Sequence, residues 1–345
     1  MGGFLLRDRF TPRAQRAWVL AGLSAPAALT LAGLSWHWAL LGSAAAAIFY
    51  YIIYRMCDLP LTHATRLAYG ASAGKIVLAL AFLWAVFAAG AAAAGSAVAY
   101  PEDGLEWIAP ACVLLLAAIG GWRGTPALSR AAGTVSLILG LLYAALLLAG
   151  LQQVTISWCR PWGGGNQTAK AFLALLAASA ALYLPQPGQK QRRTGLTFAA
   201  AAVVPAAGAC ITSGCLSPQL VQRTQAPFYA MSKSLNVLGV AERFEPFVSA
   251  ALLMGFFCLT SLLTQSAAEI AQALCPRIPG KWCALGACVL AGVAAMFAGR
   301  VPQAVQMGMA AIFWAGLPVV TLAIVAGKKG RKKSKKVLDK RDFLW

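Results

Sequence analysis

The chain alternates between long apolar stretches and short loops that hold most of its polar residues. A helix needs about 20 apolar residues to cross a hydrocarbon core of roughly 30 Å. The pattern predicts about ten transmembrane helices, near residues 15–34, 37–56, 75–99, 107–121, 132–151, 168–184, 196–212, 246–268, 282–299 and 303–326. The fourth and sixth stretches are short for a span, so we expect each to extend into its flanks or to be partly discontinuous. The sequence therefore predicts an all-α polytopic membrane protein.

Composition supports this prediction, because the 345 residues are 60% hydrophobic and only 11% charged, with a mean hydropathy of +0.69. A soluble domain of this composition would expose large apolar patches. The formal net charge is +19, but the basic residues lie at the ends of apolar stretches and in a short tail. They are placed to orient the chain in a lipid bilayer, and nucleic acid is not an expected partner.

Most of the 29 Lys and Arg residues fall in every second loop and in the C-terminal tail, whereas the acidic loop 101–106 falls on the opposite side. By the positive-inside rule, both termini are predicted to be cytoplasmic. The predicted organisation is an N-terminal segment at 1–14, a transmembrane domain at 15–327 and a basic tail at 328–345. No cleavable signal peptide is evident, so the first helix is expected to be a signal anchor. The tail is an orientation signal in the simplest interpretation and a partner-docking segment in the alternative.

Ten helices divide into five plus five, and an odd-numbered unit that repeats must return through the membrane upside down. This predicts the inverted repeat of secondary transporters, in which the first helix of each half is interrupted near the midplane. Breakers occur in the first helix from Gly22 to Pro26, although an interior proline is often only a kink. Freed backbone groups at a break bind ligands. The candidate ligand-binding residues are Gly22, Ser24, Pro26, Ser179, Ser261 and Thr264.

No catalytic or metal-binding constellation is evident in the sequence. The two histidines are His37, which lies between two tryptophans as in an interfacial aromatic belt, and His63, in a predicted cytoplasmic loop. The nine cysteines lack the close pairs of a zinc site. Cys159 and Cys215 both fall near the predicted outer side, and their spacing leaves open whether they form a disulfide. We therefore predict that the protein is not an enzyme and needs neither a metal nor a cofactor.

Several short motifs occur in a consistent order along the chain. They are Thr11-Pro12-Arg13-Ala14-Gln15, Gly121-Trp122-Arg123-Gly124, Tyr183-Leu184-Pro185, Pro227-Phe228-Tyr229 and Glu242-Arg243-Phe244-Glu245. In these motifs the chain resembles the spore germination receptor B-subunit (GerAB-type) family of the amino acid-polyamine-organocation transporter superfamily. The likeness extends over nearly the whole chain, and its most distinctive part is the Glu-Arg-Phe-Glu element before the eighth helix.

The resemblance implies the APC/LeuT-like transporter fold and a membrane subunit of a spore germinant receptor, which senses a small nutrient such as an amino acid in the spore inner membrane. It also implies assembly with an A-type receptor subunit and a C-type lipoprotein. Two alternatives stay open: a permease for an amino acid or similar solute, and a scaffold subunit that binds no ligand. Glu242, Arg243 and Glu245 are predicted to form either a structural ion-pair cluster or a subunit contact.

The chain departs from the family pattern at two places. The sixth helix contains Ala177-Ala178-Ser179-Ala180-Ala181 where the family usually has a Gly-Phe-Glu element, and the first contains Ser24-Ala25-Pro26 in place of a Gly-Ser-Gly-like break. Both departures remove polar groups from the expected site. They favour a divergent ligand specificity or a subunit that has lost ligand binding.

Overall fold

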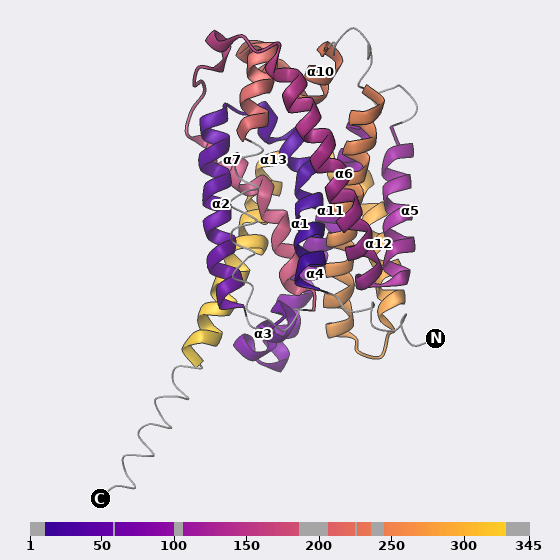
Figure 1. Cartoon of the computed structure of the whole chain (residues 1–345). Helices are drawn as coiled ribbons and strands as arrows, with labels where there is room; N and C mark the ends of the chain where they lie inside the picture. The colour runs from indigo at the N-terminus through magenta and orange to yellow at the C-terminus, as the bar shows by residue number, and fades with distance from the viewer. Residues whose placement is uncertain are drawn as a thin grey trace, which may run out of the picture.

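A computed structural model describes residues 11–57, 59–99, 106–185, 206–224, 226–235 and 245–328. Nearly all of these residues are helical, and none of them lies in a strand (Figure 1). The motif residues Glu242 and Arg243 lie outside the described ranges, as does most of the basic tail. Glu245 is the first residue of a long helix.

In the first half of the chain, the α-helices are α1 (Pro12–Leu29), α2 (Trp36–Met56), α3 (Leu61–Tyr69), α4 (Ala71–Gly95), α5 (Ile108–Arg123) and α6 (Thr125–Leu151). Short 3₁₀ turns follow three of them, namely η2 (Leu31–Gly33), η3 (Ser96–Ala99) and η4 (Ile156–Cys159). In the second half come α7 (Asn166–Leu175), the 3₁₀ segment η5 (Leu176–Tyr183), a helix at Ala206–Leu216, α9 (Pro218–Arg223), α10 (Pro227–Ser234), α11 (Glu245–Leu274), α12 (Gly280–Ala298) and α13 (Gln303–Ala310). The π-helical η6 (Ala311–Gly316) continues α13 toward Lys328.

The structure confirms an all-α polytopic membrane protein. Each of the ten predicted stretches coincides with helix, including the seventh, of which the structure describes only the part from Ala206 onward. Among the described residues, six helical segments are long and apolar enough to span a membrane: Trp36–Met56, Ala71–Ala99, Thr125–Leu151, Pro246–Leu274, Gly280–Ala298 and Gln303–Lys328. Outward-facing side chains such as Leu137 and Val289 are largely exposed, as expected for contact with lipid.

Residues 61–69, predicted as part of a loop, instead form α3, so His63 lies on a helix. The helix begins after Pro60 and ends at Gly70, whose φ of 82° favours glycine. Four of its five buried residues recur on one face, at Leu61, Ala64, Thr65 and Ala68. This helical spacing packs α3 against the bundle, mainly against α4. The stretch is too short to register as a span, which is why hydropathy missed it.

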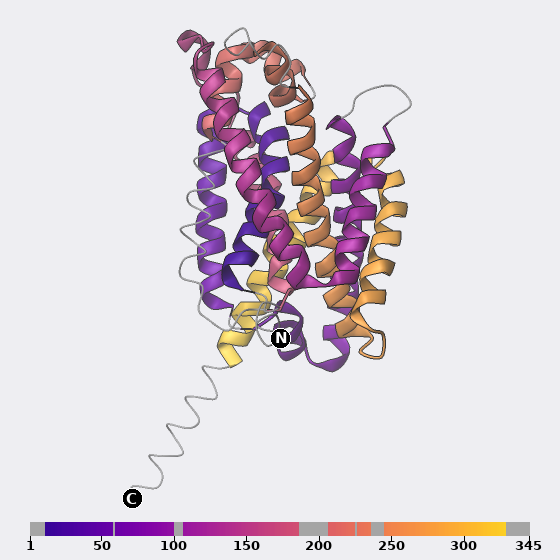
Figure 2. The ribbon, with the colours of Figure 1, turned by 45° about the vertical axis from the view of Figure 1, so that its right-hand side comes forward.

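The long helix α11 lies at the centre of the bundle and packs against α1, α4, α5, α6 and α12 (Figures 1 and 2). Small residues permit the closest approaches. A Cβ on Gly22 of α1 would lie 3.3 Å from Leu259 Cα, and a Cβ on Gly255 of α11 would lie 2.7 Å from Ser24 Oγ. The α1 and α11 backbones are therefore in near contact along the stretch that the sequence nominated for ligand binding.

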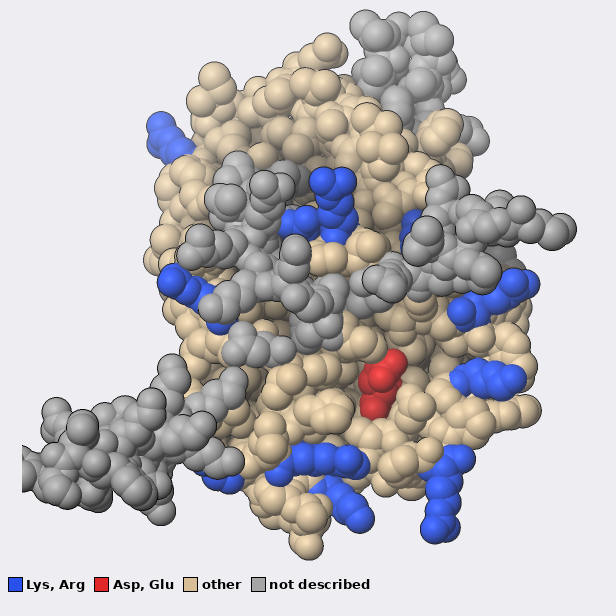
Figure 3. All heavy atoms as spheres, turned by 60° about the horizontal axis from the view of Figure 1, so that its bottom comes forward, with Lys and Arg blue, Asp and Glu red and all other residues tan. Residues whose placement is uncertain are grey.

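Basic side chains surround the end of the bundle at which α3 lies (Figure 3). This face carries the basic residues near the ends of the spans, namely Arg55, Arg66, Lys75, Arg123, Arg130, Arg277, Lys281 and Lys328. Lys328 Nζ donates to the carbonyls of Leu67 and Ala68, each at 2.8 Å, and so holds the end of the last helix against α3. Most of the described basic residues lie at this end, as the sequence predicted, and the assignment of that end to the cytoplasm stays a prediction.

Candidate functional site

The first helix is not interrupted where the sequence analysis placed a break. α1 stays helical through Gly22, Ser24 and Pro26, and the Thr30 N–H donates to the Pro26 carbonyl at 2.8 Å. Pro26 removes only one backbone bond, and close packing on α11 holds the helix on both sides of it. The prediction of a break at this position was wrong, because tertiary packing overrides a single proline.

Regular α-helical geometry is lost instead in the sixth span, where α7 gives way to η5 at Leu176. This 3₁₀ segment is eight residues long, whereas such runs seldom exceed three or four. For residues 168–184 the sequence left open extension into the flanks or partial discontinuity, and the structure shows an α-helix that gives way to a 3₁₀ segment. Non-helical backbone at membrane depth persists where it is buried in protein or lines a cavity. Within η5, residues 176 and 178–183 are all buried.

Side chains from three neighbouring helices donate hydrogen bonds to carbonyl groups in and beside η5. Tyr50 Oη, from α2, donates to the Leu175 carbonyl at 2.7 Å. Ser266 Oγ, from α11, donates to the Ala180 carbonyl at 2.8 Å, and Gln15 Nε2, from α1, donates to the Ala181 carbonyl at 3.3 Å. Carbonyls of an irregular segment can bind cations or ammonium groups. Here the protein itself occupies these three.

The predicted site residues do not converge on one point. Ser179 Oγ donates to Tyr50 Oη at 3.4 Å beside η5. Ser261 Oγ accepts from the indole N–H of Trp18 at 3.1 Å, within the packed α1–α11 contact. Thr264 Oγ1 donates to a carbonyl of its own helix at 2.9 Å. Of the six candidates, the structure places Ser24 alone in the wall of the cavity described next.

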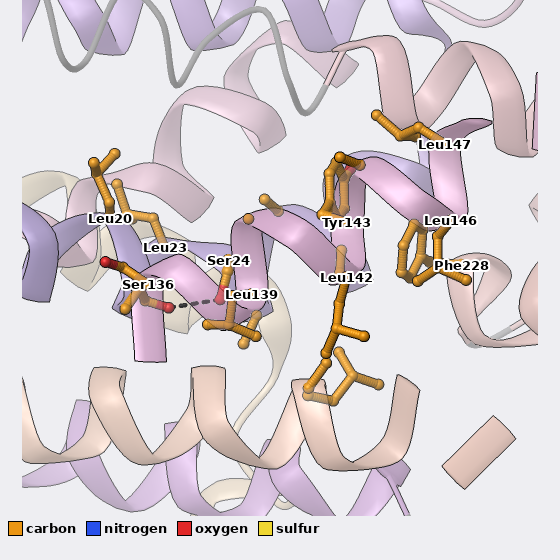
Figure 4. A pocket seen from close by; sticks show the side chains of 18 of the residues that line it. Leu20, Leu23, Ser24, Ser136, Leu139, Leu142, Tyr143, Leu146, Leu147 and Phe228 are labelled. Atoms are coloured by element: carbon orange, nitrogen blue, oxygen red, sulfur yellow. Dashed lines mark hydrogen bonds between the residues drawn. The ribbon is translucent and has the colours of Figure 1, made fainter. Parts of the chain in front are cut away.

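A cavity of about 470 Å³ lies between α1, α2, α6, α10 and α11 (Figure 4). Its size is within the range of small-molecule sites. Leucine and alanine side chains make most of the wall, including Leu23, Ala28, Ala46, Leu139, Leu146 and Leu252. The phenol of Tyr143 stacks on Phe228 with centroids 5.2 Å apart and completes an aromatic patch. Tyr50 and Leu175 bring this cavity into contact with the start of η5.

The polar groups of the cavity are hydroxyls. Ser24 and Ser136 donate to carbonyls of their own helices at 2.6 and 2.9 Å, so only their oxygen lone pairs remain for a ligand. Ser43 Oγ and Tyr143 Oη are buried and have no hydrogen-bond partner. Among the described residues, no Lys, Arg, His, Asp or Glu lines the cavity. A charged solute would therefore lose its hydration here without gaining an opposite charge.

The sequence analysis missed the contribution of α2 and α6 to this cavity. On α2, Ser43, Ala46, Ala47 and Tyr50 follow the spacing i, i+3, i+4 and i+7 and share one face. Small residues and hydroxyls at this spacing are a recognisable signal of an inward-facing surface in a membrane helix. On α6 the lining leucines have no such signal, because leucines facing lipid look the same in the sequence.

All nine cysteines are free thiols in this structure. Cys159 Sγ lies 3.6 Å from the Cys210 carbonyl, whereas Cys215 Sγ faces the Gly150 carbonyl at 3.5 Å. Cys159 Sγ therefore contacts Cys210, whereas the sequence had left open a disulfide between Cys159 and Cys215. No group of three or more potential metal ligands occurs among the described side chains.

No family model matches the sequence, and no curated protein matches it. The fold is similar to several solved transporters. One is Mhp1, a nucleobase-cation-symport-1 family transporter in a closed conformation with bromovinylhydantoin bound. The match covers 92% of this chain and 78% of the Mhp1 chain, with a TM-score of 0.67 at 13% sequence identity. Another is a substrate-bound Na⁺-coupled sialic acid symporter, for which the match covers 91% of this chain and 78% of the symporter chain, with a TM-score of 0.63 at 12% sequence identity.

A third similar structure is the Eremococcus coleocola manganese transporter, solved with an aromatic bis-isothiourea compound. It matches 93% of this chain and 78% of its own, with a TM-score of 0.56 at 13% identity. These likenesses extend over nearly the whole chain and identify the APC/LeuT type of transporter fold, as the sequence predicted. At such low identity they establish the fold alone.

Proposed function

We propose that the protein is a small-solute permease that binds its solute in the cavity between α1, α2, α6, α10 and α11. The observation that carries the proposal is the position of this cavity beside η5, in a fold shared with solute transporters. Tyr50 belongs to the cavity wall and also donates to the carbonyl at the start of η5. A solute that displaces Tyr50 would therefore alter the irregular segment directly.

The proposal is tested with purified full-length protein reconstituted into liposomes. Leu139 lines the cavity and is 8% exposed, whereas Leu141 on the same helix is 66% exposed and outside it. Leu139→Trp should fill the cavity and abolish uptake of a transported solute, and Leu141→Trp should leave uptake intact. If uptake does not exceed that of empty liposomes for any solute in a panel, the proposed permease function is refuted.

A second candidate is the germinant receptor subunit. It is supported by the resemblance centred on Glu242-Arg243-Phe244-Glu245, and by the lack of ionisable groups for ion coupling in the described wall of the cavity. Deleting the gene should then delay germination with a particular nutrient while vegetative uptake of that nutrient stays unchanged. An A-type subunit and a C-type lipoprotein should co-purify with the chain. Co-purification without binding of any solute would favour the scaffold alternative.

For either function we propose that both termini are cytoplasmic, and for the receptor that the chain lies in the spore inner membrane. The concentration of basic residues at the α3 end supports this orientation. Single cysteines introduced at positions 191 and 103 of a cysteine-free variant would test it in intact cells. Labelling from outside at 191, or protection at 103, would reverse the assignment.

A further inference from the structure

We infer that the cavity accepts an uncharged, mainly apolar solute with one or two hydrogen-bonding groups, and that it excludes amino acids and other zwitterions. This inference rests on the proposed function, since it names the solute class of the same cavity.

The first reason is the continuity of α1. A broken helix would point N–H groups and a partial positive charge at a carboxylate, and freed carbonyls at an ammonium group. The part of α1 that lines this cavity, from Leu20 to Ala28, lies within one unbroken helix. No break within this stretch frees backbone groups toward the cavity, so the interrupted helix that usually binds a zwitterion is missing from this part of the wall.

The second reason is that carbonyls in and beside η5 already have donors, and among the residues that bear them Leu175 lines the cavity. Tyr50, Ser266 and Gln15 donate to the carbonyls of Leu175, Ala180 and Ala181. An ammonium group at the Leu175 carbonyl would have to displace Tyr50 Oη from its hydrogen bond there. An uncharged solute needs no charged partner and therefore does not require this carbonyl.

The third reason is the hydroxyl of Ser43. This residue is 1% exposed, lines the cavity from α2, and its Oγ has no hydrogen-bond partner. A ligand group that reaches this hydroxyl would restore a hydrogen bond to it, which would stabilise binding. The stacked rings of Tyr143 and Phe228 provide a flat surface suited to an aromatic or cyclic solute (Figure 4).

The test uses four compounds that share one ring system and differ in charge. Indole is neutral, tryptamine cationic, indole-3-acetate anionic and tryptophan zwitterionic. Binding to the detergent-purified full-length chain is measured by equilibrium titration and by the shift in thermal unfolding. We expect saturable binding of indole, and binding at least about tenfold weaker for each charged compound, because none finds a countercharge among the described residues that line the cavity.

Variants place the binding in the cavity. Leu139→Trp should abolish indole binding and Leu141→Trp should preserve it. Should Leu139→Trp fail to fold, Ala47→Leu extends into the cavity from α2 with a smaller change. Ser43→Ala should weaken the binding of indole several-fold. It should not change the binding of indene, the carbocycle that lacks the N–H.

Each other outcome overturns the inference in a distinguishable way. Tryptophan binding more tightly than indole, and lost in Leu139→Trp, would refute the charge argument but leave the solute site standing. Indole binding that Leu139→Trp does not change would place the compound outside the cavity. No binding of any of the four by a folded protein would contradict the solute class, and the liposome assay would then decide whether the proposed function survives.

Discussion

Trp18 is the best place to test the packing between α1 and α11. Its side chain is fully buried, and its indole N–H donates to the Cys258 carbonyl and to Ser261 Oγ, both at 3.1 Å. Trp18→Phe keeps an aromatic ring but removes this donor. The Cys258 carbonyl retains one partner, because Ser261 Oγ donates to it at 3.0 Å.

The expected cost follows from two contributions. Hydrogen bonds between membrane helices contribute about 0.6 kcal/mol on average and up to about 1.7 kcal/mol. The smaller ring also leaves a gap on the order of 40 Å³, which costs about 1 kcal/mol at roughly 24 cal/mol per Å³. Together they predict a loss of about 2 kcal/mol, or roughly 30-fold in the unfolding equilibrium.

A double-mutant cycle with Ser261→Ala separates the hydrogen bond from the gap. Unfolding is measured in mixed micelles for Trp18→Phe, Ser261→Ala and the pair, and a coupling energy of about 0.6 kcal/mol is expected. Solute affinity should not change, since neither residue lines the cavity. Strictly additive effects, with Trp18→Phe costing under about 0.5 kcal/mol, would show that this bond does not stabilise the contact.

Two further predictions concern helix contacts and thiols. A Cβ on Gly90 of α4 would lie 2.5 Å from the Ala291 carbonyl oxygen of α12, so Gly90→Ala should lower the free energy of unfolding by about 1–3 kcal/mol. The control is Gly286→Ala, which adds a Cβ in open space and should be neutral or stabilising in the same unfolding assay. Catalysed oxidation of variants that keep only two cysteines should cross-link Cys159 to Cys210 faster than to Cys215, as gel mobility would show; the reverse order would contradict the placement of η4.

The number and type of spans were predictable because length and hydropathy depend only on the local sequence. The same property explains the errors. Residues 61–69 are too few to span a membrane, so hydropathy did not predict α3, although its buried residues recur at helical spacing. The loss of α-helical geometry at Leu176 was anticipated only as a short stretch, since Ala-rich sequence such as residues 177–181 is equally compatible with regular helix.

The site was less predictable because it depends on contacts between distant segments. Pro26 indicated a break, but the packing of Gly22 and Gly255 at the α1–α11 contact keeps the helix regular. Ser24→Trp is accordingly a poor probe of binding, since Ser24 lies against α11 where a larger side chain would disrupt packing. Leu139 is a better position for such a probe because it borders the cavity. No local sequence pattern on α6 indicates that Leu139 faces the cavity.

The hydrogen bonds around η5 also bear on how a solute could switch this protein between states. Three donors, Tyr50, Ser266 and Gln15, hold carbonyls along the segment. At about 0.6 kcal/mol each they contribute roughly 2 kcal/mol in total. A solute at 100 times its dissociation constant, bound to one state alone, favours that state by about 2.7 kcal/mol. Under the proposed function, binding that prefers a state with the Tyr50 contact released is therefore sufficient to rearrange η5, without any coupled ion.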